Sequence, residues 1–167
     1  MRPLVSYSTV VIKDKDGDYS LARSARDPDG MGLVRLWDEG LLLQSRGNDF
    51  RPLVVMNSWP AAAPVPDGDW EVSGPHGVRL PSGRLKARNL LESDDSDPLS
   101  LPPGGYLVRV ARRGRPEETV ELGGFDRQEV LEEWTIDLWP ATDDEAPPPA
   151  VRTRGRIPAS ARERPPL

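Results

Sequence analysis

The chain has 167 residues and no cysteine, which excludes disulfide bonds and thiolate metal sites. Its 19 prolines and 15 glycines interrupt it too often for long helices, and no apolar run reaches the roughly 18 residues that would span a bilayer. From residue 146 onward there are five arginines and one acid, a net charge of +4. The whole chain carries −5, so residues 1–145 carry −9. This negative charge disfavours nucleic acid as a partner of residues 1–145.

The first half of the chain predicts short strands joined by turns. Residues 4–13 are dense in the β-branched and aromatic side chains that favour strands, and 14–18 form a turn rich in aspartate and glycine. A hairpin turn is expected at residues 38–40. The strands predicted in this half are residues 4–13, 19–23, 32–37, 41–44 and 51–59.

The second half continues the same pattern after a proline-rich connection at residues 60–68. Two or three shorter strands are expected within 70–73 and 78–89, followed by an acidic loop over 92–105. Residues 126–133 predict either a single helical turn, because Asp126 and Glu129 resemble a capping box, or a plain loop.

Two segments near the end of this region, residues 106–115 and 134–141, alternate apolar and polar side chains with period two. Tyr106, Val108 and Val110 share one face of the first, and Trp134, Ile136 and Leu138 share one face of the second. The sequence therefore predicts an all-β, mainly antiparallel sandwich of about eight or nine strands. We assign it to residues 1–141 and expect 142–167 to be an extended tail rich in proline and arginine.

These two segments also carry a family resemblance. Tyr-x-Val-Arg-Val within residues 104–110, Arg-Gly-Arg at 113–115 and Leu-Trp-Pro-Ala within 133–141 resemble the ends of a group of small actinobacterial β-sandwich proteins of uncharacterised role. That group is distantly similar to the competence protein J family, a member of which is associated with inhibiting a nuclease. The resemblance implies a β-sandwich and a binding role, and its motif carries no catalytic residue.

Two patterns invite catalytic or metal chemistry, and both fit turns better. A calcium loop needs glycine at position 6 and glutamate at position 12, but counting from Asp14 the glycine falls at position 4 and Ala25 at position 12. His76 is the single histidine, and no Gly-x-Ser-x-Gly motif supports a serine triad. We therefore expect no metal, no cofactor and no enzymatic activity, with His76 in a turn.

The partner-binding candidates are charged or aromatic side chains, each with an ordinary structural alternative. The acidic clusters at residues 94–97 and 143–145 are either solvated loops or a surface for a basic partner. Arg113 and Arg115 either lie with Arg112 in a solvated turn, while Arg109 pairs with Asp137 across strands, or contact an anion or an acidic partner. The candidates are Asp94, Asp95, Asp97, Arg113, Arg115, Trp139, Arg152, Arg154 and Arg156.

Trp139 breaks the pattern of its own strand, because it shares a face with Thr135 and Asp137. It either packs beneath the tail or the loop at Pro60, which is the preferred interpretation, or it is an exposed anchor for a partner.

Taken together, these features predict a non-enzymatic protein-binding module. The leading hypothesis is an inhibitor or immunity protein that covers a basic partner, such as a nuclease-like toxin, with its acidic surface. The alternative is a structural subunit of a larger assembly, docked through its C-terminal arm. Nucleic acid would bind only through the tail, no membrane is involved, and the absence of an apolar signal segment at residues 1–7 predicts a cytoplasmic protein.

Overall fold

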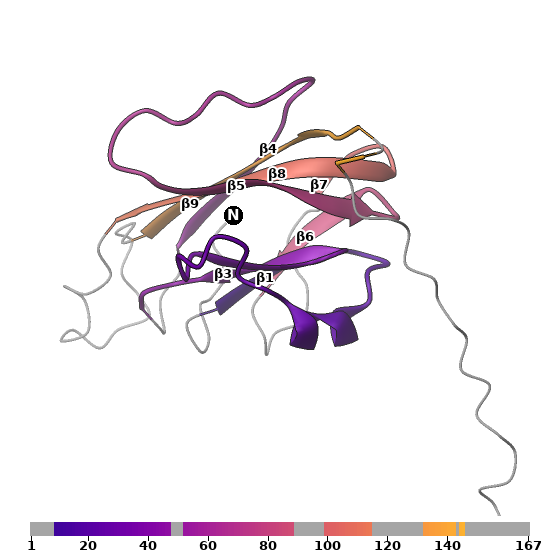
Figure 1. The fold of residues 1–167 in the computed structure, drawn as a ribbon, viewed down its shortest axis with the longest axis horizontal. Coiled ribbons are helices and arrows are strands. Elements are labelled where there is room, and N and C mark those ends of the chain that lie inside the picture. Colours follow the sequence, from indigo (N-terminus) through magenta and orange to yellow (C-terminus); the bar gives the residue numbers. More distant parts are fainter. Residues whose placement is uncertain (1–8, 48–51, 89–98, 115–131, 143, 146–167) are drawn as a thin grey trace, which may run out of the picture.

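Two β-sheets face one another in the computed structural model, which describes residues 9–47, 52–88, 99–114, 132–142 and 144–145 (Figure 1). Sheet A has the strand order β2-β3-β1-β6-β7, and sheet B has the order β4-β9-β8-β5. The elements in chain order are β1 (Thr9–Asp14), the 3₁₀-helix η1 (Tyr19–Ser24), β2 (Val34–Trp37), β3 (Gly40–Gln44), β4 (Leu53–Ser58), β5 (Glu71–Leu80), β6 (Arg84–Arg88), β7 (Leu99–Ser100), β8 (Gly104–Gly114) and β9 (Glu132–Pro140).

The predicted fold class is confirmed. Among the described residues there are nine strands, and their pairings are antiparallel except that of β4 with β9, which is parallel. The predicted hairpin is also present, because β2 and β3 pair from Trp37 and Gly40 outward. No helix in the described part of the chain is long and apolar enough to cross a bilayer.

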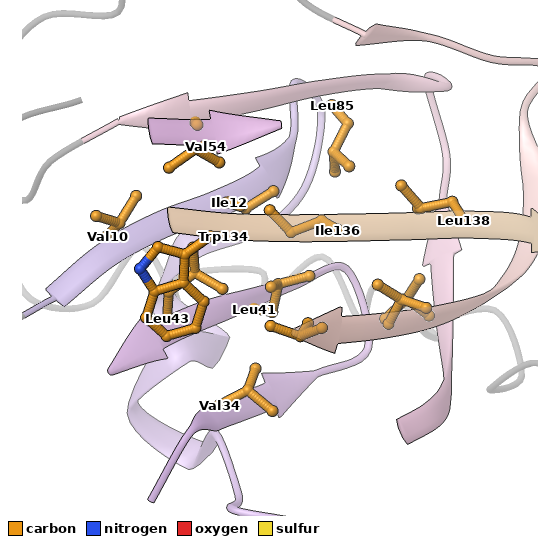
Figure 2. Close-up of a cluster of buried hydrophobic side chains, with 14 of the residues drawn as sticks. Val10, Ile12, Val34, Leu41, Leu43, Val54, Leu85, Trp134, Ile136 and Leu138 are labelled. Atoms are coloured by element: carbon orange, nitrogen blue, oxygen red, sulfur yellow. The ribbon is translucent and has the colours of Figure 1, made fainter. Parts of the chain in front are cut away.

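The core lies between the sheets and follows the period-two pattern of the sequence. In β9, Trp134, Ile136 and Leu138 point inward and are fully buried. Figure 2 shows side chains of β9 meeting those of sheet A, among them Leu41 and Leu43 of β3. Each large apolar side chain removed from water in this way contributes about 1.5–3 kcal/mol.

The strand predicted at residues 19–23 is wrong, since this segment forms η1. β1 already pairs with β3 on one side and β6 on the other, so no edge of it is open to a returning strand. The segment instead covers the outer face of sheet A. There the ring of Tyr19 packs edge-on against Trp37, with centroids 6.5 Å apart, and Arg88 lies over the same ring.

The interruption predicted between residues 73 and 78 is also wrong, because β5 continues through it. Ser73 is opposite Val110 and His76 is opposite Val108, so the three steps from 73 to 76 on β5 face two steps on β8. The extra residue is a β-bulge, a common device near the edge of a sheet. His76 therefore lies in a strand and not in a turn.

Several predictions fall partly outside the described residues, among them the acidic loop at 92–105 and the tail at 142–167. The first strand is confirmed from Thr9 onward, whereas residues 4–8 are not described. The helical turn predicted at 126–133 lies outside them except for its last two residues, Glu132 and Glu133, which belong to β9.

Candidate interaction surface

A long connection crosses the outer face of sheet B. Residues 59–70, named here the crossing loop, join β4 to β5, the two edge strands of this sheet. β4 ends opposite Leu138 and β5 begins opposite Arg112, so the loop must pass over β9 and β8 from one end of the sheet to the other. In Figure 1 it is the purple arch above sheet B.

The crossing loop is held by polar side chains that point outward from β8 and β9. Asp137 Oδ1 accepts hydrogen bonds from the Trp59 indole N–H at 3.0 Å and from Asn57 Nδ2 at 2.8 Å. Arg109 lies opposite Asp137 in the strand register and donates from Nη1 to the carbonyl of Ala63 at 2.6 Å. The register predicted for Arg109 and Asp137 is thus present, and both side chains are buried because the loop covers them.

Trp139 lies within this covered region. Only 5% of it is exposed, and the guanidinium of Arg109 lies 5.2 Å from its ring centroid. Since the same arginine is bonded to Ala63 of the crossing loop, Trp139 has the environment expected for cover by the loop at Pro60. An exposed anchor does not fit this burial.

Arg113 is exposed but already has partners within the chain. Its Nε and Nη2 donate to Glu133 Oε2 at 2.8 and 2.6 Å, and its guanidinium lies 4.5 Å from the ring centroid of Trp70. It thereby fixes the far end of the crossing loop to β8. The other predicted partner-binding residues lie outside the described residues and stay predictions: Asp94, Asp95, Asp97, Arg115, Arg152, Arg154 and Arg156.

The described strands show where the acid-rich segments attach. Segment 89–98, with four acids and no base, follows Arg88, and segment 115–131, with five acids and two arginines, follows Gly114. Arg88 pairs with Val11, two residues from the pair of Thr9 with Gln44. Arg112 Nη1 donates to the Gln44 carbonyl at 2.6 Å, which brings the end of β8 to the same end of the sandwich. We call this the acidic end.

A buried ionic network joins the two sheets at the acidic end. Arg112 donates to Gln44 of sheet A and from Nε to Glu71 Oε2 at 3.1 Å, and its Nη1 lies 3.9 Å from Glu132 Oε1. Glu132 is fully buried and accepts the indole N–H of Trp134 at 2.9 Å and the backbone N–H of Arg46 at 3.3 Å.

The solvated position predicted for Arg112 is therefore wrong. Arg112 shares the inward face of β8 with Val108 and Val110, a placement that strict alternation along the strand already implied.

A serine and a histidine of β5, an edge strand of sheet B, meet an aspartate of loop 27–32. Ser73 Oγ donates to Asp29 Oδ2 at 2.5 Å, and His76 Nε2 lies 3.0 Å from Ser73 Oγ and 3.2 Å from Asp29 Oδ2. In an acyl-transfer triad the serine and the carboxylate contact different ring nitrogens. Here both contact Nε2, the serine bonds the carboxylate directly, and Ser73 is buried. The geometry fits a cluster that fixes loop 27–32 to β5.

This cluster predicts an acid-dependent contribution to stability. The hydrogen bond from Ser73, aided by the charge and hydrogen bond of His76, holds the pKa of Asp29 below its ordinary value. A lowered folded-state pKa stabilises the fold above the ordinary carboxyl pKa, and the gain is lost as the pH falls through the folded value. We expect Asp29→Asn to lower the free energy of unfolding by about 1 kcal/mol at pH 7 and by less near pH 3, where part of the contribution is already lost. Urea unfolding at both pH values measures this, and an equal loss at both would contradict it.

Comparisons with known proteins bear on the fold. No family model and no curated protein sequence matches the chain. The structure is similar to that of ComJ from Bacillus subtilis, described as the inhibitor of the DNA degrading activity of NucA. The TM-score is 0.54 and the identity 9%, over 84% of this chain and 94% of ComJ. It also matches the product of crocagin biosynthetic gene J, with a TM-score of 0.43 and 20% identity over 85% of this chain and 94% of that one. The expected likeness to competence protein J is confirmed for the fold, whereas the actinobacterial group and its motif stay a prediction.

Proposed function

We propose that the protein is a non-catalytic, cytoplasmic binding module of the inhibitor or immunity type, which covers a basic partner protein with its acidic end. The fold it shares with ComJ supports this choice, since ComJ inhibits a DNA-degrading protein. A nuclease must present a basic surface to its nucleic acid substrate, and an inhibitor that occupies this surface needs negative charge at matching places.

The distribution of charge is the observation that carries the proposal. The described residues hold 15 acidic and 13 basic side chains, a net charge of −2, although residues 1–145 together carry −9. Segments 89–98 and 115–131, with −4 and −3, account for the difference. Segment 115–131 begins and ends at the acidic end, and segment 89–98 begins there and ends at Leu99, which pairs with Leu85 farther along β6. β9 runs away from this end, so the chain leaves Pro140 for its arginine-rich segment at the opposite end. The two acid-rich segments that begin at the acidic end support a basic partner at that end.

Inhibition assays against the nucleases of the same genome test the proposal. We expect the full chain to block DNA cleavage by one of them, with an affinity that falls about tenfold or more between low and high salt, because exposed charges are screened. Asp94→Asn, Asp95→Asn and Asp97→Asn together should weaken inhibition by a similar factor.

The matched control neutralises three acids in the turns at the other end of sheet A: Asp16→Asn, Asp18→Asn and Asp38→Asn. This control should change inhibition less than about threefold. Equal losses in both triple variants, or no inhibited nuclease at all, would overturn the proposal. The alternative of a structural subunit docked through residues 142–167 predicts that deleting 146–167 abolishes assembly, whereas inhibition should survive that deletion.

A further inference from the structure

The crossing loop contains a run of apolar residues, most of which are exposed to solvent. Residues 60–66 read Pro-Ala-Ala-Ala-Pro-Val-Pro, and five of these seven side chains are exposed. Val65 is 62% exposed and, with Met31 at 55%, is one of two large apolar side chains in the described part of the chain that face solvent. A run of exposed apolar residues favours association with another molecule, so its presence points to a binding role.

The loop is also attached to sheet B at its start, its middle and its end. The buried guanidinium of Arg109 bonds to Ala63 at its middle, Asp137 holds Trp59 at its start, and Arg113 covers Trp70 at its end. Pro60, Pro64 and Pro66 restrict the backbone between these points. A loop ordered before binding loses less conformational entropy on association, which is how rigid binding loops gain affinity.

The charge of the loop indicates the chemistry of its partner. Exposed Asp67 and Asp69 follow the apolar run, and no basic residue occurs between Trp59 and Trp70. The loop then enters β5 at Glu71, which bonds to Arg112 of the acidic end. The apolar run and the two aspartates therefore lead along the chain to the acidic end, where β5 begins.

We propose that residues 60–69 form a docking loop, which inserts Val65 and its flanking prolines into an apolar cleft of the partner while Asp67 and Asp69 meet cationic side chains at the rim of that cleft. This inference rests on the proposed function, because the partner it describes is the basic protein that the acidic end covers. It adds an apolar part to the contact, from which water is excluded.

Replacement of Val65 tests the docking loop. In the nuclease inhibition assay we expect Val65→Ser to raise the inhibition constant about tenfold, because the contact then no longer removes an apolar side chain of this size from water. Met31→Ser removes a similarly exposed side chain from a different loop and should change the constant less than about twofold. Asp67→Asn with Asp69→Asn should slow association and weaken its salt dependence. Unfolding curves of all variants should match that of the parent, since these side chains are exposed.

The outcomes separate this inference from the proposed function. Inhibition that is unaffected by Val65→Ser would overturn the docking loop and leave the inhibitor proposal intact. Absence of inhibition by the parent chain would overturn both. Concentration-dependent dimerisation of the parent that Val65→Ser abolishes, measured by light scattering, would show that a second copy occupies the loop and would also overturn the inference.

Discussion

Arg112→Ala is expected to lower the free energy of unfolding by about 3–5 kcal/mol, because it leaves a buried carboxylate without its cation. The Arg112 side chain is 6% exposed, and the fully buried Glu132 lies against it. The substitution also removes the donor to the Gln44 carbonyl and thus a direct link between the two sheets. Urea unfolding followed by tryptophan fluorescence measures the loss.

The neighbouring Arg113 provides the control. Its side chain is 52% exposed, and its ion pair with Glu133 lies in water. Exposed pairs of this kind contribute about 0–1 kcal/mol, so Arg113→Ala should lower stability by no more than about 1 kcal/mol. Similar losses for the two variants would mean that burial does not distinguish the two arginines and would contradict the network described here.

The second large effect is expected at Asp137. Its carboxylate accepts hydrogen bonds from Trp59 and Asn57 and lies opposite the buried Arg109 in the strand register. Asp137→Ala leaves the Trp59 indole N–H without its acceptor under the crossing loop and leaves Asn57 with Thr135 alone, at a cost of about 2–4 kcal/mol. Because Trp59 begins the loop, limited proteolysis should also become faster within residues 59–70.

Asp137→Asn removes the negative charge of this side chain but keeps a hydrogen-bond acceptor, so it separates the two effects. The amide oxygen can still accept the Trp59 indole N–H, so loop cleavage should stay close to the parent rate, while stability falls by less than in the alanine variant. A parent-like rate of proteolysis in Asp137→Ala would show that this carboxylate does not hold the crossing loop.

The regular strands could be predicted because their signal is local. Alternation in β8 and β9 gave the inward faces correctly, and composition gave the hairpin of β2 and β3. The strand predicted at residues 19–23 is wrong because their composition suits a strand, while both edges of β1 are occupied. Whether an edge is open depends on strands distant in the sequence, which no local pattern contains.

The candidate site was less predictable for the same reason. Alternation along β8 already implies that Arg112 lies inside the sandwich and not in a solvated turn. Asp29 and His76, by contrast, are 47 residues apart, and Ala63 and Arg109 are 46 residues apart. No spacing in the chain indicates such pairs.

The sequence by itself determined the two-faced strands, the short turns and the separation of an acidic body from a basic end, because side-chain alternation and charge are properties of neighbouring residues. Only the tertiary structure decided that β4 and β5 form opposite edges of one sheet. That topology sends the crossing loop over Arg109 and Trp139 and leaves Val65 exposed. The pairing of distant strands sets these positions, since burial depends on what lies above a side chain in space.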